Sequence, residues 1–125
     1  MVTSPLIAVV DDDPWARSGL GELVTAHGYE VRLFASAQEF VSSPIVATTK
    51  CLITDLNMPG MSGLELLTHL RHAGYELPVI IVTAYPTEEV RSRAHKDGAT
   101  SFLSKPVDEE ALITCVTNAL IEATQ

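Results

Sequence analysis

The sequence predicts an α/β fold in which a doubly wound sheet of five parallel strands alternates with helices. Two observations predict it: short apolar runs recur along the chain, and longer amphipathic stretches separate them. The runs cover residues 6–10, 31–34, 51–54, 79–83 and 100–103. The first, third and fourth runs are almost continuously apolar, which is typical of strands that helices cover on both faces.

Capping residues indicate where the helices begin. Asp13-Pro14 combines a capping side chain with a proline at the first helical position, and Gly28 ends that helix. Residues 36–39 match a capping box for a short second helix. The remaining helices are expected at residues 63–72, about 86–98 and about 108–121, where apolar residues recur at helical spacing.

Length and charge exclude several classes of function. A chain of 125 residues has the size of one domain, so residues 1–125 are expected to form a single unit. The net charge is −8 and the eight Lys and Arg form no basic stripe, which argues against direct nucleic-acid binding. The apolar runs are too short to cross a membrane and no signal-peptide pattern is present, so the protein is expected in the cytoplasm.

The cysteines and histidines show no ligand-like cluster. Cys51 and Cys115 lie far apart, and each sits in an apolar pattern. We therefore expect two buried thiols rather than a disulfide or a metal site. The four histidines are expected at the surface or near helix ends.

Carboxylates gather at the ends of two predicted strands. Asp11 and Asp12 follow the first strand, and Asp55 follows the third. In a parallel sheet of strand order 2-1-3-4-5 these strands are neighbours beside the point where the order reverses, which is where α/β proteins bind ligands. Clustered carboxylates repel one another unless a cation neutralises them, and hard oxygen ligands favour Mg²⁺. The sequence therefore predicts a magnesium site there.

Two further strand ends carry groups that recognise anions. Thr83 ends the fourth strand with a hydroxyl, and Lys105 follows the fifth with an ammonium group. A carboxylate nucleophile, a divalent cation, a hydroxyl and a lysine around one point are the parts needed to move a phosphoryl group. Taken singly, a threonine in a strand and a solvated lysine are ordinary, so the prediction depends on their joint placement.

Four segments together resemble the motif set of response-regulator receiver domains: VVDDDP, ITDLNMPGMSGLELL, PVIIVTAYP and GATSFLSKP. They span nearly the whole chain, and the resemblance implies a flavodoxin-like fold. It implies that Asp55 is the phosphoacceptor and that Mg²⁺, or Mn²⁺ in its place, is held by Asp11, Asp12, Asp55 and the backbone carbonyl of Asn57. The identity of the side chain at position 57 is expected to be secondary.

The same resemblance assigns the groups that bind the phosphoryl group and those that respond to it. It implies that Thr83, Ala84 and Lys105 contact the phosphoryl group, that Thr83 and Phe102 form the switch, and that the peptide bond between Lys105 and Pro106 is cis. The chain departs from the commonest pattern at Tyr85-Pro86, where Tyr85 is expected to modulate dephosphorylation. Phenylalanine at 102 lacks the hydroxyl of a tyrosine, which favours a less sharply two-state switch.

The resemblance implies a phosphoacceptor switch rather than an enzyme acting on other substrates, although the domain would catalyse its own phosphorylation and dephosphorylation. The partner would be a sensor histidine kinase or a phosphotransfer protein. The motifs are closest to receivers that precede a LuxR-type helix-turn-helix, which implies transcription regulation as the output. The fourth helix and fifth strand are expected to form a phosphorylation-dependent homodimer.

Two rival functions use similar elements. A phosphatase of the haloacid dehalogenase type also uses an aspartate nucleophile, but its nucleophile follows the first strand and a second aspartate comes two residues later. Here Asp55 follows the third strand and Asn57 stands at that place. An FMN-binding protein could share the sheet, but acidic strand ends would repel the FMN phosphate.

Overall fold

The computed structural model describes residues 4–123 and confirms the predicted fold class. Five parallel strands form one sheet in the order β2-β1-β3-β4-β5. The strands are β1 (Leu6–Val10), β2 (Glu30–Phe34), β3 (Cys51–Asp55), β4 (Val79–Thr83) and β5 (Ser101–Ser104). The helices are α1 (Pro14–Ala26), α2 (Ala37–Val41), α3 (Gly63–His72), α4 (Glu88–Lys96) and α5 (Glu109–Ala123), with a 3-10 helix, η1, at Pro44–Thr48.

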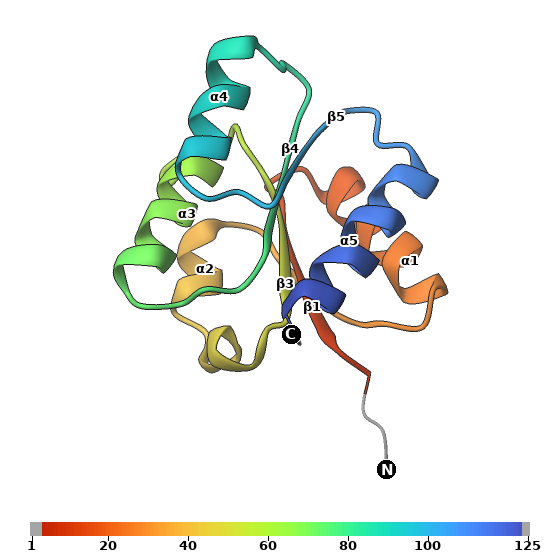
Figure 1. Ribbon diagram of the computed structural model, residues 1–125. Helices are drawn as coiled ribbons and strands as arrows, with labels where there is room; N and C mark the ends of the chain where they lie inside the picture. Colours follow the sequence, from red (N-terminus) through yellow and green to blue (C-terminus); the bar gives the residue numbers. More distant parts are fainter. Residues whose placement is uncertain (1–3, 124–125) are drawn as a thin grey trace.

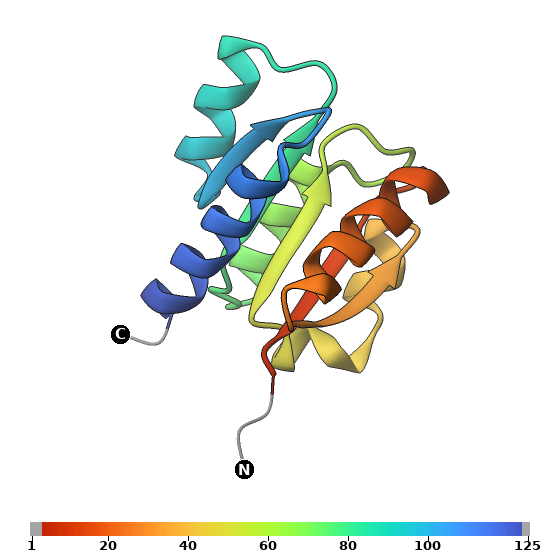
Figure 2. The ribbon, with the colours of Figure 1, turned by 90° about the vertical axis from the view of Figure 1, so that its right-hand side faces the viewer.

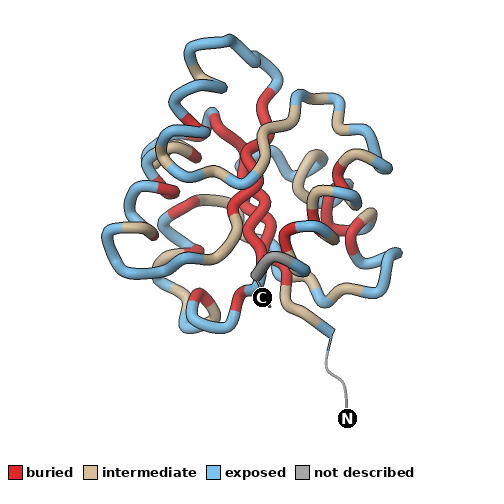
Figure 3. Tube along the Cα trace, in the orientation of Figure 1, coloured by how far each residue is buried: buried red, intermediate tan, exposed pale blue. Residues whose placement is uncertain are grey.

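The sheet is the middle layer of three. Helices α2, α3 and α4 cover one face, and α1 and α5 cover the other (Figure 1 and Figure 2). Successive side chains of β1 point to opposite faces of the sheet. Ala8 and Val10 pack with α2 and α3, whereas Ile7 and Val9 pack with α1 and α5. Buried residues therefore run along the central strands, as Figure 3 shows.

The predicted helix starts are confirmed, with one shift. The Asp13 carboxylate accepts a hydrogen bond from the backbone N–H of Trp15 at the start of α1. Helix α4 begins at Glu88 rather than near residue 86, because the Thr87 hydroxyl caps it by accepting from the N–H of Val90. Strand β5 lies one residue later than expected, and η1 was not predicted.

A capping box that the sequence analysis did not identify fixes the start of α3. The Ser62 hydroxyl accepts from the N–H of Glu65 at 3.2 Å, and the Glu65 carboxylate accepts from the N–H of Ser62 at 3.0 Å. These bonds satisfy backbone donors that the helix itself leaves unpaired. They set the angle at which α3 leaves the loop after β3.

The two ends of α4 differ in how firmly they are held against the neighbouring elements. Ala94 is its one fully buried residue, near the C-terminal end. At that end the Arg71 guanidinium of α3 donates hydrogen bonds to the carbonyl oxygens of Tyr75 and Gly98. Helix α4 is thus tied to α3 beyond its last turn, while in its first turn only Val90 is half-buried against the core.

The expectation of two buried thiols is half right. Both cysteines are free, and Cys51 is buried in β3, where burial and the nearby Cys115 raise the pKa of its thiol to about 12. Cys115 is only half-buried, because it packs at the edge of the core that Leu112, Val116 and Ala119 of α5 help to form. The four histidines are exposed, as expected. Among the described helices, none has the length and apolar character needed to cross a membrane.

Candidate functional site

Three carboxylates meet at the carboxyl ends of β1 and β3. The strands are hydrogen-bonded neighbours in the sheet, with Val10 opposite Thr54, so Asp11 and Asp55 emerge side by side. One carboxylate oxygen from each of Asp11, Asp12 and Asp55 lies within 4.8 Å of the others. Asp11 and Asp55 are buried and Asp12 is exposed, so the cluster opens to solvent on one side.

Lys105 joins the two buried carboxylates. Its Nζ lies 3.0 Å from Asp11 Oδ2 and 3.3 Å from Asp55 Oδ1. The peptide bond between Lys105 and Pro106 is cis, as the motif resemblance implies. The backbone N–H of Lys105 donates to the carbonyl of Thr83, which attaches this loop to the end of β4. Asp55, Thr83 and Lys105, predicted from three separate strand ends, therefore come together.

The electrostatics of the cluster favour binding of a further cation. Burial raises the pKa of Asp55, the neighbouring Asp11 raises it further, and Lys105 offsets part of this rise. Burial alone would lower the pKa of Lys105, but its hydrogen bond to Asp11 and the charges of Asp11 and Asp55 outweigh burial and raise it. One ammonium group thus faces three carboxylates, and the site keeps negative charge.

The donor set fits a hard divalent cation. Asp11, Asp12 and Asp55 offer carboxylate oxygens, which Mg²⁺ prefers to nitrogen or sulfur ligands. The N–H of Asp13 donates to Asp11 Oδ1 at 3.0 Å and so fixes the orientation of that carboxylate. The role expected for the backbone carbonyl of Asn57 stays a prediction.

Thr83 is fully buried at the end of β4, and its hydroxyl accepts two hydrogen bonds. Asn57 Nδ2 donates to it at 3.1 Å, and the backbone N–H of Tyr85 donates to it at 3.1 Å. The identity of the side chain at position 57 was expected to be secondary, yet the Asn57 carboxamide makes this contact. No local pattern signals this contact, because it joins the loop after β3 to the last residue of β4.

Gly63 brings the start of α3 directly against the phosphoacceptor candidate. Its N–H donates to the carbonyl of Leu56 at 2.9 Å. A Cβ at this position would lie 2.5 Å from the backbone oxygen of Asp55, closer than atoms can approach without displacement. Gly63, the second glycine of the ITDLNMPGMSG segment, is therefore required by close packing on Asp55.

The second switch candidate, Phe102, lies on β5 beside α4. Phe102 is half-buried, and the guanidinium carbon of Arg91 lies 4.9 Å from the centre of its ring. The other predicted site residues are exposed: Ala84 and Tyr85 in the loop after β4, and Pro106 in the loop after β5. The exposed fraction of Tyr85 is 75%.

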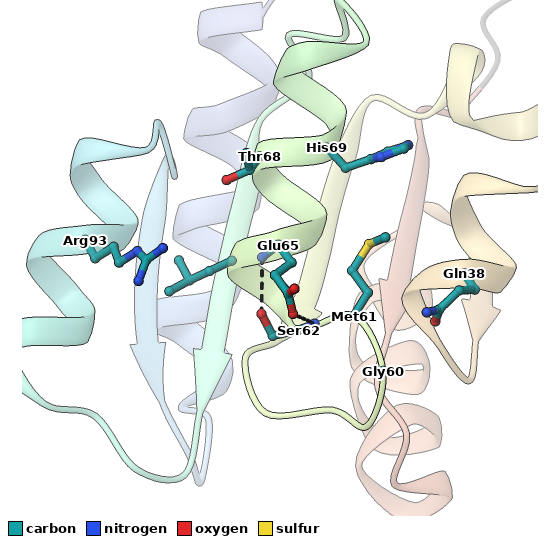
Figure 4. Close-up of a pocket in the computed structure, with 9 residues that line it drawn as sticks. Gln38, Gly60, Met61, Ser62, Glu65, Thr68, His69 and Arg93 are labelled. Atoms are coloured by element: carbon teal, nitrogen blue, oxygen red, sulfur yellow. Dashed lines mark hydrogen bonds between the residues drawn. The ribbon is translucent and has the colours of Figure 1, made fainter.

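A groove of about 860 Å³ lies elsewhere, along α3 between α2 and α4 (Figure 4). Its lining includes Gln38, Met61, Thr68, His69 and Arg93. Figure 4 shows the Ser62–Glu65 capping bonds at its edge. None of the three clustered carboxylates lines this groove, so it is separate from the acidic site.

Comparison with known proteins agrees with the geometry. The family model for the response regulator receiver domain matches residues 7–117. Nodulation protein W of Bradyrhizobium diazoefficiens is 37% identical, over 94% of this chain and 52% of that protein. The transcriptional regulatory protein FixJ of Azorhizobium caulinodans is also 37% identical, over 91% of this chain and 54% of its own length. The chain spans about half the length of these curated relatives.

Solved structures of response regulators have the same fold as this chain. The response regulator StyR superposes with a TM-score of 0.89 at 36% identity, over 98% of this chain and 62% of that chain. A response regulator receiver domain protein from Clostridium thermocellum superposes with a TM-score of 0.89 at 27% identity, over 96% and 97% of the two chains.

Proposed function

Because this chain belongs to the family of response regulator receiver domains, we propose that it accepts a phosphoryl group on Asp55 in a Mg²⁺-dependent reaction. The observation that carries the proposal is the approach of Asp55 to Asp11, Asp12 and Lys105 at one edge of the sheet. The assignment of the chain to this family leaves a haloacid dehalogenase-type phosphatase and an FMN-binding protein without support.

Receiver domains are phosphorylated by histidine kinases, so the donor would be the phosphohistidine of a sensor kinase or of a phosphotransfer protein. An Asp55 carboxylate oxygen forms a bond to phosphorus as the bond from phosphorus to the histidine nitrogen breaks, and the nitrogen keeps the electron pair. Asp11, Asp12, Asp55 and the Asn57 carbonyl would hold the Mg²⁺ or Mn²⁺. The bound cation supplies neutralisation of charge on the carboxylates and on the transferred group.

Three groups of this chain would then bind the phosphoryl oxygens. Lys105 already lies 3.3 Å from Asp55 and would donate from its ammonium group. Thr83 would donate from its hydroxyl, and Ala84 from its backbone N–H. Water later removes the phosphoryl group, which makes the domain its own phosphatase.

The switch would couple Asp55 to the α4 and β5 face. Thr83 turns toward the phosphoryl group, and Phe102 follows it inward, which repacks the loosely held first turn of α4. The relatives named as transcriptional regulatory proteins support transcription regulation as the output of a longer chain. The two free thiols support a location in the cytoplasm, where thiols stay reduced.

The test of the phosphoacceptor is mass spectrometry after incubation with acetyl phosphate and Mg²⁺. The wild-type domain should gain one phosphoryl group, and Asp55→Asn should gain none. An Asp55→Asn domain that still gained it would refute the assignment.

The test of the metal site is a Mg²⁺ titration followed by the fluorescence of Trp15, which lies three residues after Asp12 and is 85% exposed. Asp12→Ala removes a direct carboxylate ligand and should abolish the response to Mg²⁺, since a neutral methyl group cannot replace that ligand. An identical titration for both proteins would count against the site.

We further propose that phosphorylation creates a homodimer surface on α4 and β5. The basic Arg91, Arg93 and Lys96 on α4 and the acidic Asp108, Glu109 and Glu110 before and in the first turn of α5 are exposed and of opposite sign. Sedimentation with and without beryllofluoride at micromolar concentration should show a monomer that becomes a dimer. A monomer under both conditions would leave a different protein as the partner of this face.

A further inference from the structure

The hydroxyl of Thr83 has its acceptor capacity filled. A hydroxyl oxygen carries two lone pairs and one proton. Here Asn57 Nδ2 and the N–H of Tyr85 donate to that oxygen, each at 3.1 Å. Within residues 4–123, no hydrogen bond uses the proton of the Thr83 hydroxyl, so this hydroxyl can still donate one hydrogen bond.

The two donors differ in how they respond to movement of Thr83. The Tyr85 N–H belongs to the same loop and lies two residues further along the chain, so it can travel with Thr83. Asn57 lies 26 residues earlier, in the loop that follows β3, two residues after Asp55. Its carboxamide therefore ties the side chain at the end of β4 to a separate loop, the loop that leads away from the phosphoacceptor.

We propose that Asn57 is a positioning residue that holds Thr83 in the unphosphorylated arrangement and so sets how readily the domain switches. The inference rests on the proposed function, in which the Thr83 hydroxyl turns toward a phosphoryl group on Asp55. That turn moves the oxygen away from the Asn57 carboxamide and breaks the bond between the two loops. The Tyr85 N–H imposes no such tie between separate strands.

The exposure of Asn57 determines which arrangement the Asn57–Thr83 hydrogen bond favours. Asn57 is exposed, so its carboxamide finds water when Thr83 leaves it, and the active arrangement leaves no buried amide unpaired. The bond therefore stabilises the inactive arrangement by the net value of one hydrogen bond. That value corresponds to a shift of about three- to tenfold in the switching equilibrium.

The experiment is a double-mutant cycle read by the affinity for beryllofluoride in the presence of Mg²⁺. Asn57→Ala should tighten beryllofluoride binding about three- to tenfold, because the inactive arrangement loses its tie. In a Thr83→Ala background the same substitution should have no effect, since no hydroxyl remains to be held. Asn118→Ala is the matched control, an exposed asparagine on α5 remote from the site, and should leave the affinity unchanged.

Unchanged or weaker binding by Asn57→Ala would overturn the proposal, as would an equal gain in the Thr83→Ala background. A second measurement works without beryllofluoride: the side-chain amide resonances of Asn57 in the free domain should move toward solvent-exposed values in Thr83→Ala. Asn57 amide resonances that kept the same chemical shifts in Thr83→Ala would also overturn the proposal. A wild-type domain that bound no beryllofluoride would refute the proposed function alone, because the amide resonances still report whether Asn57 holds Thr83.

Discussion

Lys105 and Asp11 lie 3.0 Å apart, although β3 and β4 separate their strands in the sheet. The bond crosses the crevice above the carboxyl ends of the central strands, and Asp11 is fully buried beneath it. Asp55, at the end of β3, shares the same ammonium group at 3.3 Å. One positive charge therefore serves two buried negative charges, which leaves Asp55 under-neutralised in the free domain.

The incomplete neutralisation of the Asp55 charge predicts how the stability of the domain depends on pH. Burial and Asp11 raise the pKa of Asp55 above its usual 3.8, so the folded domain binds that proton more tightly than the unfolded chain does. The ionised carboxylate therefore destabilises the fold at neutral pH, and this cost is removed as the pH falls through the folded pKa toward 3.8. In a chelator, Asp55→Asn should raise the melting temperature at pH 7, by an amount that shrinks toward pH 3.8.

Thermal denaturation across this pH range provides the measurement, with Asp97→Asn as the control for removal of a carboxylate elsewhere. A gain for Asp55→Asn that was constant or grew toward acid pH would contradict the predicted sign.

The contact between Gly63 and Asp55 predicts a costly substitution. Gly63→Ala places a methyl group 2.5 Å from the Asp55 backbone oxygen, so α3 or the end of β3 must shift. We expect a loss of about 1–3 kcal/mol in the free energy of unfolding, the usual range for overpacking. Chemical denaturation would measure it, and slower phosphorylation should accompany it because Asp55 is displaced.

Gly19 supplies the matched control for that change. It lies within α1, and a Cβ there would meet nothing within 4 Å. Gly19→Ala should therefore stabilise the domain by about 0.5–1 kcal/mol through helix propensity. Equal effects of the two substitutions would show that close packing on Asp55 is unimportant.

Tyr85 predicts the lifetime of the phosphorylated form. Its ring is 75% exposed two residues after Thr83, where it can screen the aspartyl phosphate from attacking water. Tyr85→Ala should accelerate dephosphorylation several-fold, measured by the decay of the phosphorylated mass. Tyr75→Ala, at an exposed tyrosine remote from the site, is the control. An equal or slower rate in Tyr85→Ala would exclude shielding.

The Arg91–Phe102 pair predicts a link between α4 and β5. The guanidinium group over the ring at 4.9 Å is a cation–π contact, worth about 0.5–1 kcal/mol at an exposed site. Arg91→Ala should lower the free energy of unfolding by about this amount, and Arg91→Lys should retain part of it. In a Phe102→Leu background the loss should disappear. A full loss in that background would assign the effect to other contacts of Arg91.

The features predicted correctly are those encoded in short stretches of sequence. Strand β4 and helix α3 have the expected bounds, because an apolar run and a run with leucines at helical spacing each determine their own element. The meeting of Asp11 with Asp55 followed from strand order. The bond between Asn57 and Thr83 could not be predicted in the same way, because it depends on how the loop after β3 lies relative to the end of β4. The half-exposure of Cys115 likewise depends on the rotation of α5 about its own axis.

The attachment of α4 at one end determines the kind of motion available to it. Arg71 ties the Gly98 end to α3, and Ala94 is buried near that end, whereas the first turn has no fully buried residue. A displacement of Thr83 should therefore rotate the helix about a pivot at Gly98 instead of sliding it along the sheet. Nine residues make a helix about 13 Å long, so a rotation of about 10° moves its first turn by about 2 Å. Side chains of that first turn would move furthest, while those beside Arg71 would hardly change position.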